Sequence, residues 1–232
     1  MLKQFIAAVM GGIMIAIGGC VYLNAATLTL GSFVGAFFFS VALVCICLKG
    51  YGLFTGRVGY FPSTPTLDEA KGLGMTLAGN AVSTFLIGAA VAATMQEGMA
   101  SVAYALTIAK LATPWYLTLL RAVLCGVLMY LAVSIYREKN TLAGILFCVP
   151  AFIIAGFEHS IADMFYLAAS GYRDIAGLFF LLLVIVGNAI GGMMLPLLTR
   201  LGDWAPKAEE PEESAAAEEA EGEEAPAAEV VE

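Results

Sequence analysis

The sequence is poor in charged residues and contains a single histidine. Charged side chains make up 13% of the 232 residues, whereas 60% are hydrophobic and the mean hydropathy is +0.87. Soluble domains carry about a quarter charged residues, so this composition excludes an ordinary soluble domain. A lone histidine without an HExxH motif argues against an intramembrane metalloenzyme, and we expect neither a metal nor a cofactor.

Cysteine is also scarce, and its spacing excludes a disulfide framework. All five cysteines lie inside apolar stretches. Cys45 and Cys47 are separated by one residue, which is closer than in the usual metal or redox pair. We therefore expect the cysteines to be small packing residues.

Long apolar runs occupy nearly all of the chain before Leu201. Runs of roughly 20 apolar residues are typical of membrane-spanning helices. Six such runs cover about 5–23, 30–53, 72–95, 116–136, 142–169 and 175–198. The sequence therefore predicts an all-α membrane protein with six transmembrane helices and one membrane channel domain over residues 1–203.

The remaining residues, 204–232, form an acidic segment of low complexity. Eleven of the nineteen acidic residues are glutamates at or after Glu209, so the net charge of −8 conceals a basic membrane domain. A segment with so much charge has little to bury, and we expect it to be a disordered, solvating tail.

The distribution of basic residues predicts the orientation. An even number of spans places both termini on one side, and a cytoplasmic placement satisfies the positive-inside rule. The inner side then holds Lys3, Lys49, Arg57, Lys71, Arg137, Lys139, Arg200 and Lys207, and the outer side holds Lys110, Arg121 and Arg173. We expect a multi-pass protein of the cell (inner) membrane, embedded in lipid, with both termini cytoplasmic and no nucleic-acid partner.

The two halves of the chain share a pattern. Residues 78–82 read AGNAV in the third run, and residues 186–190 read VGNAI in the sixth. The second and fifth runs are interrupted by glycine and polar residues, at 48–62 and 155–165. Three spans per half reverse the direction of the second half, so the pattern predicts a 3+3 inverted repeat with broken helices 2 and 5. Such breaks are tolerated where they line a cavity, and they indicate a binding site near the midplane.

These motifs resemble the formate/nitrite transporter family, which includes formate, nitrite and hydrosulfide channels. The resemblance rests on LFTG (53–56), GFEHSIADMF (156–165) and GNAIGG (187–192), and it covers about residues 3–200. It implies an aquaporin-like protomer with its own pore, assembled as a homo-pentamer.

The same resemblance implies which residues form the pore. His159 corresponds to the central histidine, Glu158 to the acidic residue before it, Thr55 to the pore-loop threonine, Lys110 to the lysine of the outer vestibule and Asn188 to the sixth-span asparagine. The hydrophobic constrictions correspond to Leu43, Leu53 and Phe54, and to Phe39 and Phe152. Simpler roles stay open: Glu158 as a partner for backbone amides, Lys110 as a surface charge, and Thr55 and Asn188 as helix caps.

Three positions depart from the family pattern. Gly126 replaces a usual asparagine, Arg57 stands where asparagine is common, and Asp163 replaces the asparagine of IANMF. We expect Gly126 to widen the outer chamber and Arg57 to be a membrane anchor. Asp163 is expected to cap the second half-helix or to pair with Arg173.

The chemistry of the site favours weak acids. A bare anion in hydrocarbon costs on the order of 10 kcal/mol, whereas its conjugate acid crosses dry constrictions neutral. With a reference pKa of about 6.5, His159 could exchange that proton. Alternatively, it stays neutral and donates a hydrogen bond while Lys110 concentrates anions.

The sequence therefore predicts a channel or proton-coupled facilitator for small monovalent anions or their conjugate acids. Formate, nitrite, hydrosulfide and short-chain carboxylates all fit, with protons as co-substrate. The alternative is a neutral small-solute channel of the aquaglyceroporin type, although Asn-Pro-Ala boxes are absent from the sequence.

Overall fold

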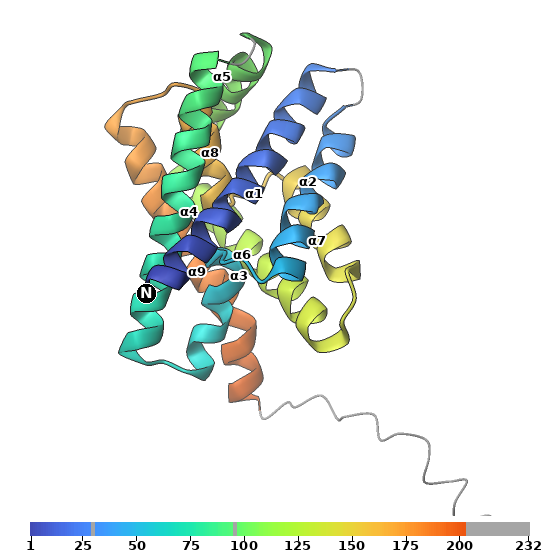
Figure 1. The fold of residues 1–232 in the computed structure, drawn as a ribbon, viewed down its shortest axis with the longest axis vertical. Coiled ribbons are helices and arrows are strands. Elements are labelled where there is room, and N and C mark those ends of the chain that lie inside the picture. The colour runs from blue at the N-terminus through green and yellow to red at the C-terminus, as the bar shows by residue number, and fades with distance from the viewer. Residues whose placement is uncertain (29–30, 95–96, 203–232) are drawn as a thin grey trace, which may run out of the picture.

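The computed structural model of the chain describes residues 1–28, 31–94 and 97–202, so the predicted tail, 204–232, lies outside the described residues. Within these ranges the regular structure is helical throughout, which agrees with the predicted all-α class (Figure 1). The elements are α1 (Leu2–Thr27), α2 (Gly31–Lys49), α3 (Phe54–Arg57), the 3₁₀ helix η1 (Val58–Ser63), α4 (Leu67–Thr94), α5 (Glu97–Leu111), α6 (Trp115–Lys139), α7 (Ala143–Ile154), α8 (Ser160–Ala169) and α9 (Ile175–Leu201).

Five of these helices are long and apolar enough to cross a membrane. They are α1, α2, α4, α6 and α9, with 19 to 28 residues each. Large apolar side chains, among them Phe33, Leu86 and Phe179, are exposed on their outer surfaces. Such a surface is costly in water, whereas lipid or a neighbouring subunit accommodates it.

The second and fifth apolar runs each divide into two helical pieces. α2 ends at Lys49 and α3 begins at Phe54, while α7 ends at Ile154 and α8 begins at Ser160. Both interruptions coincide with the glycine and polar residues that the sequence places there. The freed backbone groups therefore lie at the end of the second apolar run and in the middle of the fifth.

The same glycine turn ends the first piece in both cases. Gly50 and Gly156 each have a φ of +68°, a left-handed conformation that glycine adopts without strain. The next residue then donates its N–H to the carbonyl five positions earlier, from Tyr51 to Ile46 and from Phe157 to Phe152, both at 2.9 Å. This is the Schellman arrangement, and its occurrence at both breaks makes the two halves locally equivalent.

The Gly-Asn-Ala motifs permit two close helix contacts. A Cβ on Gly79 of α4 would lie 2.7 Å from the carbonyl oxygen of Phe5 on α1, and a Cβ on Gly187 of α9 would lie 3.2 Å from that of Leu119 on α6. Only a residue without a side chain allows such backbone approach. The α1–α4 and α6–α9 pairs therefore pack in the same way.

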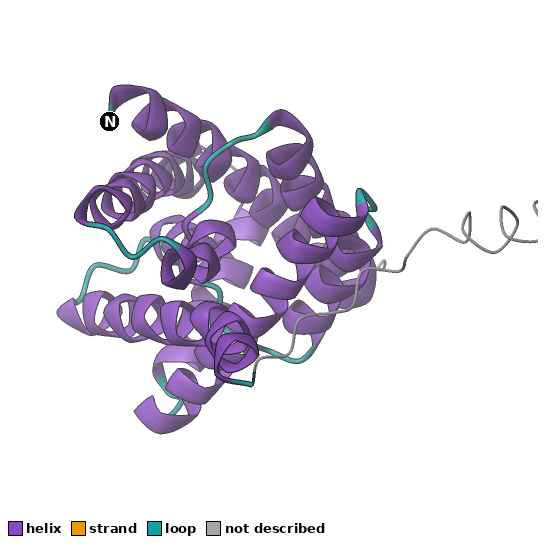
Figure 2. Cartoon of the chain, turned by 90° about the horizontal axis from the view of Figure 1, so that it is seen from below, coloured by secondary structure: helices purple, strands orange, loops and turns teal. Residues whose placement is uncertain are grey.

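The helix α5 was not expected from the sequence. Its 15 residues connect α4 to α6 and pack against α8 and α1 (Figure 1). Seen from below, the chain shows helices joined by loops (Figure 2). The helix α5 thus brings a segment that connects two spans into contact with α8, in the fifth apolar run, where the candidate site lies.

Candidate functional site

Two cavities lie at different depths along the bundle. The larger, of about 570 Å³, is lined by Lys3 near the start of α1, and the smaller, of about 100 Å³, by Tyr22 near the end of that helix. We call them the wide cavity and the narrow cavity. Arg57 and Arg137 also line the wide cavity, and Lys110, His159 and Asp163 line the narrow one.

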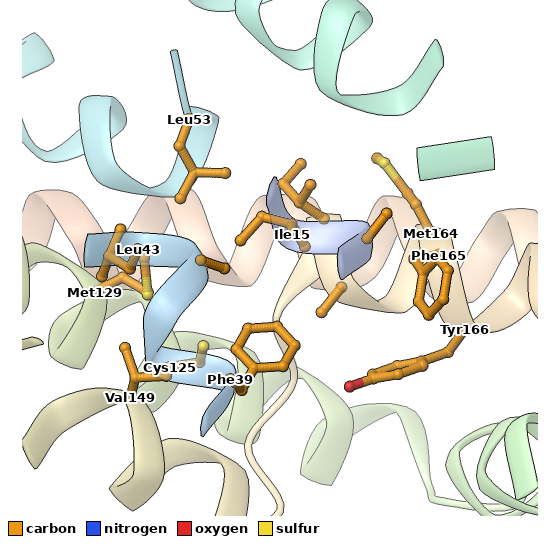
Figure 3. Packing of buried hydrophobic residues seen from close by; sticks show 14 of the residues in the cluster. Ile15, Phe39, Leu43, Leu53, Cys125, Met129, Val149, Met164, Phe165 and Tyr166 are labelled. Carbon is orange, nitrogen blue, oxygen red and sulfur yellow. The ribbon is translucent and has the colours of Figure 1, made fainter. Parts of the chain in front are cut away.

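Apolar side chains separate the two cavities. Leu43 and Leu53 line the wide cavity, and both are only 2% exposed, whereas Phe39 and Phe152 line the narrow one. The rings of Phe39 and Phe152 meet edge to face with centroids 6.5 Å apart. Figure 3 shows Phe39 and Leu43 projecting from α2 into the apolar interior, with Leu53 opposite. The fifth residue predicted for a constriction, Phe54, is buried but lines neither cavity.

His159 is held between these side chains by two hydrogen bonds. Its Nδ1 accepts from the backbone N–H of Ala162 at 3.1 Å, which makes the histidine the N-cap of α8. Its Nε2 lies 2.9 Å from Oγ1 of Thr55, and its ring stacks on Phe152 with an interplanar angle of 16°. The side chain is 2% exposed.

These bonds define the tautomer of the imidazole. Because Nδ1 accepts a hydrogen bond from Ala162, the proton of a neutral ring resides on Nε2. Nε2 then donates to Thr55, and the Thr55 hydroxyl keeps its own hydrogen as a donor. A second proton on the ring would displace the cap of α8. The hydrogen bonds are therefore those of a neutral histidine whose single N–H is donated to Thr55.

The predicted asparagine of the sixth run holds the backbone of the second break. Asn188 accepts from the N–H of Ser160 and donates to the carbonyls of Glu158 and Ala122, all at 2.8 Å. These contacts match the capping role left open for Asn188, and they fix the segment that carries His159.

Lys110 forms the centre of a buried charge cluster. It lies on α5, donates a hydrogen bond to the carboxylate of Glu158, and lies 3.0 Å from Oδ1 of Asp163. Its side chain is 19% exposed, so it is not a charge on a surface loop. The expected pairing of Asp163 with Arg173 is wrong, because Asp163 lies against Lys110 instead. This cluster connects α5 to the second break.

The other two departures from the family pattern are Arg57 and Gly126, and the structure shows the contacts of both. Arg57 lines the wide cavity, where its Nη2 lies 3.6 Å from Glu69. The expectation that Gly126 widens the outer chamber is wrong, because a Cβ there would lie 2.8 Å from the backbone nitrogen of Gly192. Gly126 therefore serves the close approach of α6 to α9.

The fold and this site define a helical membrane transporter with a central histidine. A model of the formate/nitrite transporter family matches residues 1–201, and the chain belongs to that family. This is a family of transporters and channels rather than of enzymes, and it does not favour the neutral-solute alternative.

Curated relatives are identical to this chain at about a quarter of the aligned positions. The chain is 27% identical over 194 residues to the nitrite transporter NirC of Salmonella typhimurium, covering 75% of this chain and 71% of the relative. It is 28% identical over 181 residues to formate-nitrite transporter 2 of Toxoplasma gondii, covering 68% of this chain and 38% of the relative. The chain thus spans little more than a third of the latter protein.

Solved structures share the fold. An ion channel of the FNT family superposes with a TM-score of 0.75 at 22% identity, covering 88% of this chain and 91% of that one. A pentameric formate channel with formate bound superposes with a TM-score of 0.72 at 20% identity, covering 86% and 96%.

Proposed function

We propose that the chain is a channel or proton-coupled facilitator for small monovalent anions or their conjugate acids. Formate, nitrite, hydrosulfide and short-chain carboxylates are the candidate substrates. The observation that carries the proposal is His159, which lines the narrow cavity and is held by Thr55 and by the backbone of α8.

The proposed path runs from one cavity to the other past the histidine. Leu43 and Leu53 on one side and Phe39 and Phe152 on the other leave no polar partner for a bare ion. A substrate that carries a proton avoids this cost. The hydroxyl of Thr55, polarised by the N–H of His159, then supplies a donor to the substrate oxygen or sulfur.

The matched breaks support a six-helix 3+3 inverted repeat with an aquaporin-like protomer. Counting α2 with α3, and α7 with α8, as one broken helix each brings the five long helices to six spans. The Schellman turns at Gly50 and Gly156 and the paired Gly-Asn motifs occur at equivalent places. The breaks thereby present polar groups at one depth, as in other inverted-repeat transporters.

A homo-pentamer accounts for the apolar outer surface. Exposed phenylalanines and leucines on the long helices suit contact with lipid or with a neighbouring subunit. The superposable formate channel is pentameric, and we propose the same assembly here, in the cell membrane with both termini in the cytoplasm.

Flux measurements test the transport proposal. The full chain in proteoliposomes is expected to move formate and nitrite, with a rate that rises as the external pH falls, while protein-free liposomes do not. Glycerol flux without anion flux would support the neutral-solute alternative and overturn the proposal. The orientation is tested separately with Lys3→Cys, which an impermeant thiol reagent should label in inside-out but not right-side-out vesicles, beyond the background of the unmutated chain.

A further inference from the structure

We propose that Asp163 is the residue that hands a proton to the anionic substrate in the narrow cavity. This rests on the proposed transport function and assigns to it a proton donor specific to this chain. The family motif has an asparagine at this position, and an asparagine has no proton to release.

Asp163 has the position of a donor. It lies in the first turn of α8 with a side chain that is 2% exposed, and it lines the narrow cavity together with Lys110 and His159. Its Oδ1 lies 3.0 Å from Nζ of Lys110, whereas its Oδ2 has no hydrogen-bond partner among the described residues. Buried polar atoms without partners are rare, and this one borders a space of about 100 Å³ that a small anion can occupy.

Glu158 does not share that position. Its carboxylate accepts the hydrogen bond of Lys110, and its side chain, 1% exposed, does not line either cavity. Asp163 is thus the carboxyl of the cluster that borders the narrow cavity.

The balance of charge favours a proton on the pair of carboxyls. One ammonium faces two carboxyls in a buried site, so two ionised carboxylates would leave one negative charge without compensation. Such a charge would also repel an incoming anion. A proton on Oδ2 of Asp163 removes both costs and turns the unpartnered oxygen of a residue that lines the narrow cavity into a donor.

Among the residues that the structure describes, the other neighbours of Asp163 provide no second cation. Packed around α8 are Lys110 from α5, Cys20 and Tyr22 from α1, Cys125 from α6, and Tyr166 and His159 from α8 and its cap. The basic residues of α3 and α9, Arg57 and Arg200, lie elsewhere, against Glu69 and the carbonyl of Pro62. The ionisable residues of α4, Asp68, Glu69 and Lys71, lie at its first turn, on the side of the wide cavity.

The transfer itself is a simple exchange. The O–H bond on Oδ2 of Asp163 breaks, and the proton forms an O–H bond on formate or nitrite. Asp163 is left as a carboxylate beside Lys110, and the neutral acid moves past Phe39 and Phe152 toward His159. A hydronium ion that enters the narrow cavity from the more acidic side returns a proton to Asp163 and leaves as water.

Asp163→Asn tests the proposal by transport. The variant keeps the size of the side chain and a polar contact to Lys110. We expect formate uptake from the side of the narrow cavity to fall by roughly tenfold or more and to lose its dependence on pH, since a positioned proton donor contributes ~10²–10⁴-fold. The matched control is Glu138→Gln, an exposed carboxyl at the end of α6, which should behave as the wild type.

Infrared spectroscopy tests the proposed protonation of Asp163 without a transport measurement. The wild-type protein should show the C=O stretch of a protonated carboxyl that shifts in heavy water, and Asp163→Asn should lack it while Glu138→Gln retains it. Glu158→Gln should also lack it, because Lys110 then faces one carboxyl, which ionises.

The outcomes separate the two proposals. Wild-type protein that moves no anion overturns the transport function even if the infrared band is present. Wild-type protein that transports with the same rate and pH profile as Asp163→Asn overturns the donor role, as does a band that survives in that variant. If Asp163→Asn fails to assemble, Asp163→Glu is measured instead: a displaced C=O band supports the donor at this position, and an unchanged band overturns it.

Discussion

Asn80 and Asn188 make the same three hydrogen bonds in the two halves of the chain. Asn80 accepts from the N–H of Phe54, at the start of α3, and donates to the carbonyls of Gly52 and Ala8 at 2.9 and 2.7 Å. Asn188 accepts from the N–H at the start of α8 and donates to the carbonyl two residues before it and to one on the neighbouring helix. Each side chain thereby satisfies the backbone groups that one break sets free.

This equivalence predicts that replacing either asparagine lowers the stability of the protein by the same amount. Asn80→Ala and Asn188→Ala should each destabilise the protein by about 1–3 kcal/mol, because buried backbone groups lose their partners. The measurement is the melting temperature of the detergent-solubilised protein. Asn140→Gly is the control, since Asn140 is exposed with a φ of +48° that glycine accepts, and its melting temperature should hardly change. A drop for only one of the two buried asparagines would contradict the equivalence.

Substitutions of Thr55 test whether its hydroxyl donates a hydrogen bond to the substrate. Thr55→Val keeps the shape of the side chain but removes the hydroxyl that lies 2.9 Å from His159. We expect formate flux to fall by roughly tenfold, the effect of losing one hydrogen bond to a charged or polarised group. Thr55→Ser restores the hydroxyl and should restore most of the flux. Equal flux in the valine variant would show that the hydroxyl takes no part.

His159→Asn separates the two roles of the histidine. Asparagine is among the best N-caps, so α8 and the assembly should persist, as judged by elution volume and melting temperature. The ring nitrogen that faces Thr55 is lost, and the pH dependence or the ratio of formate to nitrite flux should change. A variant that transports with an unchanged profile and ratio would remove His159 from the mechanism.

Gly126→Asn restores the usual residue of the family at the cost of packing. The new side chain would meet the backbone of α9, so we expect a loss of about 1–3 kcal/mol in stability. Gly74→Asn on α4 is the comparison, because no atom lies within 4 Å of a Cβ there. A Gly126→Asn protein that is as stable as the wild type, with a changed ratio of formate to butyrate flux, would reinstate the idea of a widened chamber.

The elements that the sequence predicts well are those with local causes. Runs of apolar residues produce the long helices, and Gly50 and Gly156 end helices because few other residues adopt a left-handed conformation. The Gly-Asn-Ala motifs mark matching positions because glycine allows two helices to approach closely there. The family and the all-α class follow from these short stretches.

Contacts between distant residues were not predictable in the same way. Lys110 and Glu158 are 48 positions apart, and a helix that was not expected, α5, brings them together. For Asp163 the sequence offered a helix cap or a pairing with Arg173, which is nearer in sequence, because nothing local indicates that α5 packs on α8. The direction in which Gly126 points also depends on how α6 meets α9.

The imidazole of His159 both caps the N-terminus of α8 and lines the narrow cavity. A displacement of that ring would unwind the first turn of a buried helix, so the middle of the protein is a fixed point rather than a hinge. Arg57, half-buried at the wide cavity, can by contrast change partners without disturbing this centre.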